Sequence, residues 1–271
     1  MILYEDKDLI VCHKPAKVAV QSARIGEKDL VSILNNHLAE QSGRKSGPPQ
    51  TVFVVHRLDQ PVEGIVVFGK TKKAAAGLSK QITDGSMKKI YRAVCCVTDA
   101  ARSRIENGEM EANLVDYLIK DGRTNTSAIA KKGQKDAKEA RLSYRILDRA
   151  GKLAFDGQSP EAEGGSAADP VCCVLTEIHL DTGRHHQIRV QMANAGLPLY
   201  GDSKYNPQWE QYAALMQGIQ TGQRRSADPA LCAAELSFVH PITGKVMHFK
   251  TEPKKESFRM FVSPNQQTAE A

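Results

Sequence analysis

The chain has 271 residues, of which 41% are hydrophobic and 25% are charged, and this is the composition of an ordinary globular protein. Its formal net charge of +6 gives a mild bias towards polyanionic partners. No apolar run approaches the roughly 20 residues of a membrane-spanning helix, and the acidic N-terminus does not resemble a signal peptide, so we expect a cytoplasmic protein with no membrane partner.

The first fifty residues predict strands followed by a helix. Residues 2–14 read as short strands around a polar turn, and the Lys-Pro pair at 14–15 ends them. Residues 30–40 carry apolar side chains at helical spacing. Residues 41–50 break this pattern completely and predict a flexible loop.

Residues 51–70, TVFVVHRLDQPVEGIVVFGK, organise the chain. Two β-rich runs flank the polar sequence HRLD at 56–59. Pro61 lacks a backbone N–H and ends any regular ladder, and Gly64 allows the chain to enter a second strand. A charge between apolar strands is costly unless it is paired or functional, so Asp59 is the first candidate for a role in chemistry.

The remaining elements predict an α+β fold. Residues 127–149 suit either a helix by composition or two strands around a polar turn, and we favour the strands. The other expected elements are a helix at 72–82 with Thr71 as N-cap, strands at 88–97 and 171–180, a helix at 184–196, a helix or insertion loop at 208–220, and a hairpin of 231–241 with 244–253. Strands outnumber helices without alternating with them, which predicts a mixed or antiparallel central sheet flanked by helices and loops.

Six cysteines are present, and none of them has C-x-x-C spacing: Cys12, Cys95, Cys96, Cys172, Cys173 and Cys232. This pattern does not predict a zinc site. In a cytosolic chain we expect reduced, buried thiols that pack as small hydrophobic side chains.

Four motifs lie far apart in the chain: HRLD at 56–59, KIY at 89–91, TGRHHQIR at 182–189 and GDSKY at 201–205. Together with FVHP at 238–241, their order and spacing resemble the RluA-type RNA pseudouridine synthases from about Tyr4 to Phe261. The resemblance implies the catalytic fold of that family in a single domain, 1–271, with flexible insertions at about 41–50 and 156–170 and no N-terminal RNA-binding extension. It also implies a structured ribosomal or transfer RNA as substrate, a monomer, and a reaction without cofactor or metal. No G-x-G-x-x-G sequence is present, which agrees.

The resemblance assigns roles to residues whose types suit the chemistry. Asp59 would be the nucleophile or charge stabiliser, and Arg189 would keep it ionised through a bidentate pair. Tyr91 would stack on the uracil, and it is a candidate for removing the proton from carbon 5. Arg57 would fill the gap that the flipped base leaves.

Further residues of the motifs are expected to contact the substrate RNA: His56, Lys89, Arg184, His186, Gln187 and Ile188. His56 also suits a core position, and His186 and Gln187 also suit hydrogen bonds to loops around the pocket. Asp202 and Tyr205 are expected to brace their turn. The basic run at 131–145 is by default a solvated face, with contact to RNA phosphates as a second hypothesis.

The chain departs from the family pattern at Val62 and Glu63, where many members carry Thr-Ser. Glu63 places a second carboxylate near Asp59, and we expect it to point away. This departure motivates an alternative function, a non-catalytic RNA-binding protein on the same scaffold. A metal-dependent hydrolase built on His185 and His186 is a weaker hypothesis, because adjacent side chains on a helix diverge.

Overall fold

The computed structural model describes residues 1–22, 26–41, 51–150, 173–206, 208 and 228–261, and every structural statement below concerns these ranges. Its contacts group into two compact units: unit 1 is 1–91, 179–181 and 231–253, and unit 2 is 92–178, 182–230 and 254–271. Of the insertion expected at about 41–50, Gln41 is helical instead, because the helix begun at Leu30 continues through it. The rest of that insertion, the one expected at 156–170, and residues 209–220 of the expected helix or loop lie outside the described residues. The single catalytic domain stays a prediction.

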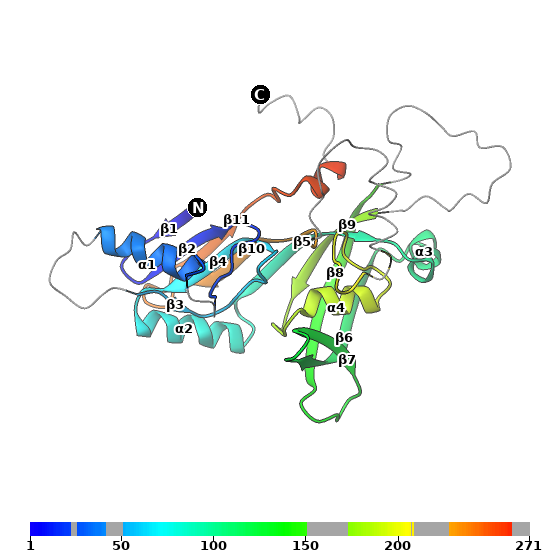
Figure 1. The fold of residues 1–271 in the computed structure, drawn as a ribbon, viewed down its shortest axis with the longest axis horizontal. Helices are drawn as coiled ribbons and strands as arrows, with labels where there is room; N and C mark the ends of the chain where they lie inside the picture. The colour runs from blue at the N-terminus through cyan, green and yellow to red at the C-terminus, as the bar shows by residue number, and fades with distance from the viewer. Residues whose placement is uncertain (23–25, 42–50, 151–172, 207, 209–227, 262–271) are drawn as a thin grey trace. The chain divides into compact units, whose positions relative to one another are not determined.

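Unit 1 contains a mixed sheet in the order β1 (Ile2–Glu5), β2 (Leu9–Lys14), β4 (Glu63–Gly69) and β10 (Leu231–Val239) (Figure 1). β3 (Phe53–Val54) pairs with β4, and β11 (Val246–Lys250) pairs with β10. β4 and β10 run parallel, whereas β1–β2, β2–β4, β3–β4 and β10–β11 are antiparallel. The predicted strands and the predicted C-terminal hairpin are therefore confirmed.

Two predicted helices, α1 (Leu30–Gln41) and α2 (Lys72–Thr83), are confirmed in unit 1. The Thr71 side chain accepts a hydrogen bond from Ala74 N at 3.2 Å, and this N-cap starts α2. Leu78 of α2 packs into a cluster of buried side chains from β2, β4, β10 and β11: Leu9, Val11, Ile65, Val67, Leu236, Phe238 and Met247. Met87, which follows α2, belongs to the same cluster. Burial of these apolar side chains against one face of the sheet stabilises the unit.

Unit 2 contains strands in the order β5 (Lys88–Cys96), β9 (Cys173–Leu180), β8 (Lys138–Ala150), β6 (Glu111–Asp121) and β7 (Thr126–Ala130). The first residues of β5 and the last of β9 belong to unit 1. Every second residue of β8 from Ala140 to Ile146 is buried, which is the period of a strand with one covered face. The strand interpretation of 127–149 is confirmed, and the helix alternative is wrong.

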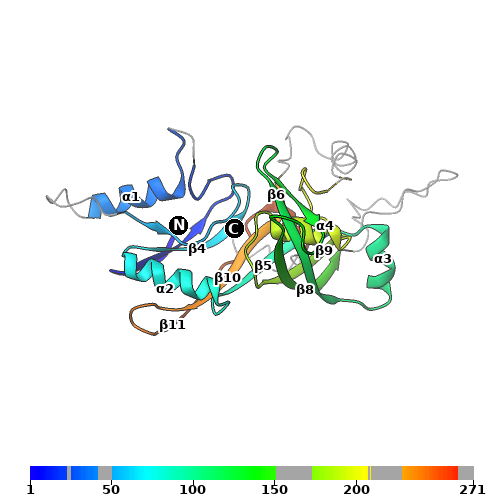
Figure 2. The same cartoon turned by 90° about the horizontal axis from the view of Figure 1, so that it is seen from below.

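Two helices of unit 2 differ from expectation. The helix α3 (Asp99–Glu106) was not predicted, although Ala101 and Ile105 have helical spacing and are both buried. α4 (Gln187–Asn194) was predicted, but it is buried all round from Gln187 to Met192, polar residues included. It lies against the β6–β7 hairpin (Figure 2). A short 3₁₀ helix, Glu256–Phe261, ends the described chain.

Five cysteines fall within the described residues, and all five are buried free thiols: Cys12, Cys95, Cys96, Cys173 and Cys232. This confirms their expected packing role, while Cys172 lies outside the described residues. None of the helices within the described ranges is long and apolar enough to span a bilayer.

Candidate active site

The HRLD segment, residues 56–59, leaves the sheet of unit 1 directly after the short strand β3. The ring of His56 continues the contact with β4, because its Nε2 accepts a hydrogen bond from Val67 N at 3.1 Å. Burial, together with the charge of Lys89, lowers the pKa of His56 to about 3. His56 is therefore a neutral ring that attaches the HRLD segment to β4. Of its two predicted roles, this favours a structural role in the core over contact with RNA.

The bend after Asp59 is held by two sets of hydrogen bonds. Val62 N donates to the Asp59 carbonyl at 3.0 Å and closes a turn across Pro61. The fully buried ammonium of Lys14 donates to the Gln60 carbonyl at 3.1 Å and to two carbonyls of its own loop. This role of Lys14 was not predicted from the motifs. The signal for it in the sequence is a charged residue at the end of an apolar strand.

Gly64 ends the bend and starts the main part of β4. Its φ is +129°, and a Cβ atom there would lie 2.5 Å from the nitrogen and 2.7 Å from the Cα of Ala233 in β10. Only glycine fits both this backbone conformation and this close approach. The expected role of Gly64 in re-entering the sheet is confirmed.

The HRLD and K-x-Y motifs lie within electrostatic reach of each other in unit 1. Burial raises the pKa of Tyr91, and Asp59 and Cys232 raise it further, so the phenol is neutral. Asp59 is partly exposed and Tyr91 is only 6% exposed. Burial lowers the pKa of Lys89, which the charge of Asp181 partly offsets. Arg57 is exposed to solvent.

Arg189 lies in α4 of unit 2, where it forms a bidentate pair with Asp202. Nε lies 2.7 Å from Oδ2 and Nη2 lies 2.6 Å from Oδ1, and both residues are buried. Asp202 Oδ1 also accepts the backbone N–H groups of Lys204 and Tyr205, so its bracing of the turn is confirmed. The sequence did not predict this partner for Arg189. The pairing of Arg189 with Asp59, a residue of unit 1, stays a prediction.

His185 and His186 do not diverge as expected. Their rings stack with centroids 3.8 Å apart, because His186 precedes α4 and has a left-handed backbone with φ 52°. His185 uses both ring nitrogens, Nδ1 with Ser127 Oγ at 2.9 Å and Nε2 with Asn125 Oδ1 at 3.1 Å. A metal ion on this ring would displace one of these contacts, which disfavours the hydrolase hypothesis.

The other TGRHHQIR residues are bound into unit 2. Gln187 Oε1 accepts from Thr182 Oγ1 and Arg184 N, and its Nε2 donates to the Arg141 carbonyl at 3.0 Å. Arg184 is exposed, with Nε 2.8 Å from the Glu139 carbonyl. Ile188 is 5% exposed. The expected hydrogen bonds of Gln187 to surrounding loops are confirmed, and contact of these residues with RNA stays a prediction.

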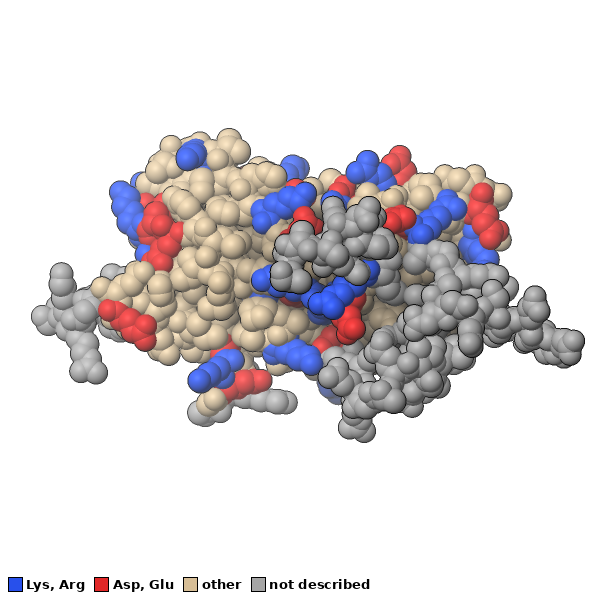
Figure 3. Space-filling model, turned by 90° about the horizontal axis from the view of Figure 1, so that it is seen from above, with Lys and Arg blue, Asp and Glu red and all other residues tan. Residues whose placement is uncertain are grey.

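The basic run at 131–145 is a solvated face, as expected by default. Its cationic residues are all exposed: Lys131, Lys132, Lys135, Lys138, Arg141 and Arg145. Arg141 pairs with Glu139, and Arg145 pairs with Glu177 at 3.3 Å. Figure 3 shows Lys and Arg side chains interspersed with Asp and Glu on the face that it draws.

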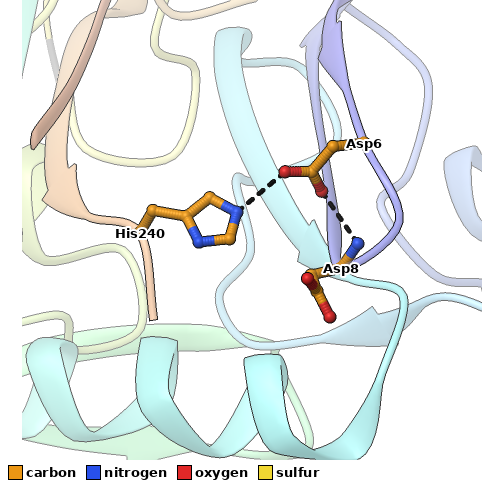
Figure 4. A group of neighbouring side chains, drawn as sticks. All are labelled: Asp6, Asp8 and His240. Carbon is orange, nitrogen blue, oxygen red and sulfur yellow. Dashed lines mark hydrogen bonds and ion pairs between the residues drawn. The ribbon is translucent and has the colours of Figure 1, made fainter. Parts of the chain in front are cut away.

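Asp6, Asp8 and His240 form a group of potential metal ligands within unit 1 (Figure 4). His240 Nδ1 accepts the N–H groups of Ile242 and Thr243, so its proton is on Nε2 and is donated to Asp6 Oδ2 at 2.8 Å. Asp6 also accepts hydrogen bonds from Tyr4 and from backbone N–H groups. Because the His240 nitrogens are already engaged, this group favours a structural tie between two turns over a metal site.

The chain was compared with known proteins. A family model described as RNA pseudouridylate synthase matches residues 8–194. The ribosomal large subunit pseudouridine synthase D of Zymomonas mobilis is 30% identical over 262 residues, which are 96% of this chain and 71% of the relative. The tRNA pseudouridine synthase C of Vibrio cholerae is 30% identical over 242 residues, 89% of this chain and 86% of the relative. The structure of human RNA pseudouridylate synthase domain containing 4 is similar over 96% of this chain and 90% of the human chain, with a TM-score of 0.67 and 18% sequence identity.

Proposed function

The chain belongs to the RNA pseudouridylate synthase family, and from this membership we propose that it converts uridine in structured RNA to pseudouridine with Asp59 as the essential carboxylate. The observation that carries the assignment of Asp59 is its proximity to Tyr91, which brings two motifs together in unit 1. The carboxylate is partly exposed at a bend that Lys14, His56 and Gly64 hold in place.

The reaction is an isomerisation. The bond between uracil N1 and ribose C1′ breaks, the base turns, a bond forms between C5 and C1′, and a proton leaves C5 while N1 gains one. Because the balance needs no oxidant, reductant or group donor, acid–base and electrostatic groups are sufficient. The uridine must leave its stack, which costs a few kcal/mol, and Arg57, which is exposed, would occupy the gap.

Asp59 serves either as nucleophile or as the negative charge that stabilises a cationic ribose, and both roles need the ionised form. We propose that Arg189 supplies the compensating positive charge. In support, Arg189 stands at the arginine position of the family pattern, and Asp202 holds its guanidinium through Nε and Nη2. Tyr91 would stack on the uracil through its ring.

The substrate belongs to ribosomal or transfer RNA, in line with the names of the two relatives above. Site choice in RNA depends on the shape of loops and on unpaired bases. A cytoplasmic location and a monomeric state belong to the same proposal, and light scattering of the purified protein would test the monomer.

Release of tritium from cellular RNA labelled at uracil carbon 5 tests the function. The RNA comes from cells that lack the gene, so that the target uridines are unmodified. The wild-type protein should release label, and Asp59→Asn should release none because the isosteric amide carries no charge. Glu63→Gln is the matched control, since it removes the other carboxylate of the bend and should leave release within about threefold.

The non-catalytic alternative rests on Val62 and Glu63 alone, and nothing else in the described residues favours it. It predicts RNA binding without label release from any RNA fraction. Equal release by the wild type and Asp59→Asn would contradict the role of Asp59 while leaving the reaction itself in place.

A further inference from the structure

Tyr205 follows α4 in the GDSKY turn of unit 2, and its ring is fixed by a small apolar cluster. The ring packs against Leu118 of β6, Ala140 of β8 and Val190 of α4. These three side chains are at most 5% exposed. Three elements therefore determine where the ring lies.

The hydroxyl of Tyr205 is fixed as well. Ser127 N in β7 lies 2.8 Å from the hydroxyl oxygen, and a backbone N–H can only donate. The hydroxyl is also hydrogen-bonded to His186 Nδ1, which lies 2.7 Å away. Burial and the charge of Arg189 lower the pKa of His186 to about 3, so this ring is neutral and able to accept.

The guanidinium of Arg189 lies over the Tyr205 ring, with its Cζ 5.0 Å from the ring centroid. This is within the range of a cation–π contact. Asp202 binds the same guanidinium along one edge. A ring against the face of the guanidinium opposes its rotation out of that plane.

We propose that Tyr205 is a positioning residue for Arg189, fixing the plane of its guanidinium. The backbone of Ser127, which holds the Tyr205 hydroxyl, is itself held in place because β7 pairs with β6 at this residue. The inference rests on the proposed function, in which Arg189 pairs with Asp59. Tyr205 itself contacts neither the substrate nor the reacting atoms.

Turnover of labelled RNA measured as kcat and KM tests this role. Tyr205→Leu removes the ring and the hydroxyl and should lower kcat by about 10²-fold, the effect of a small misplacement of a catalytic group, with KM for RNA unchanged. Tyr205→Phe keeps the ring and should lower kcat by a smaller factor. Ser127→Ala keeps the backbone N–H that holds Tyr205, so it is the matched control and should leave kcat unchanged.

A double-variant comparison separates positioning from a general loss of structure. Arg189→Lys keeps a charge but lacks the planar group, so adding Tyr205→Leu to it should lower kcat little further. An equal fold reduction in both backgrounds would overturn the inference, as would a Tyr205→Leu variant with wild-type kcat. Circular dichroism at the assay temperature gives the folded fraction, and kcat is taken per folded molecule. A wild-type protein that releases no label would instead overturn the proposed function itself.

Discussion

Arg189 and Asp202 are joined edge to edge inside unit 2, with the carboxylate fully buried and the guanidinium 4% exposed. Arg189→Met therefore removes more than a catalytic charge, because it leaves Asp202 buried without its partner. We expect this variant to lose about 3–5 kcal/mol of unfolding free energy together with its activity. An arginine that paired with Asp59 alone would lose activity on this substitution while the protein kept most of its stability.

The double variant Arg189→Met/Asp202→Asn separates the two effects. The neutral amide needs no counter-charge and keeps an oxygen for the N–H groups of Lys204 and Tyr205. Urea unfolding should recover most of the lost stability, while tritium release should stay absent. Recovery of wild-type turnover would contradict the catalytic role of Arg189.

Tyr91→Phe tests whether the hydroxyl takes part in the chemistry. Phenylalanine keeps the ring for stacking, so RNA affinity by filter binding should be unchanged, while single-turnover release should fall by about 10²–10⁴-fold. Because burial raises the pKa of Tyr91, only a small fraction is the tyrosinate that can remove the C5 proton, so the wild-type rate should rise with pH between about pH 6 and 9. Tyr91→Leu, which lacks the ring, should also weaken RNA binding. Full release by Tyr91→Phe would restrict this residue to stacking.

His186 makes the stability of the protein sensitive to acid. Its pKa is about 3 in the folded state and about 6.5 when unfolded, so between these values the unfolded chain binds a proton that the folded chain does not. The free energy of unfolding is therefore at its full value above about pH 6.5 and falls as the pH is lowered, by about 2 kcal/mol at pH 5.

His186→Asn should reduce this loss between pH 7 and pH 5 by about 2 kcal/mol, as followed by urea unfolding. Asparagine tolerates the left-handed backbone at this position and offers an oxygen to the Tyr205 hydroxyl. His56, which has a similarly lowered pKa, should retain its own share of the acid sensitivity in this variant. An unchanged pH dependence would show that His186 is charged or exposed in the folded protein.

Gly64→Ala should destabilise unit 1 by about 3 kcal/mol or more, since the new methyl group meets the Ala233 backbone at a positive φ. Gly244→Ala is the matched control, because its φ is +74° and a Cβ there meets nothing within 4 Å. Thermal unfolding should place the control within about 1 kcal/mol of the wild type. Similar losses in both variants would point to backbone strain alone and not to the approach of β10.

Local patterns in the sequence were sufficient for most strands and for three helices, since apolar periodicity and caps are encoded within a few residues. The motifs also identified His56, Asp59, Tyr91 and Arg189 as candidate site residues. The pairing of Arg189 with Asp202 was not predicted, because it depends on how a later turn returns to α4. The buried Lys14 and the link between His56 and Val67 were missed for the same reason, since each joins residues distant in the chain.

The bend between His56 and Gly64 is anchored at both ends, by the hydrogen bond of the His56 ring to β4 and by the close approach of Gly64 to the backbone of β10. Val62 and Glu63, where the chain departs from the family pattern, are both buried within this interval, and Glu63 pairs with Cys232 of β10. Other residues at these two positions therefore require the packing around them to change as well. The departure is a change in the interior of unit 1 and not a change of its surface.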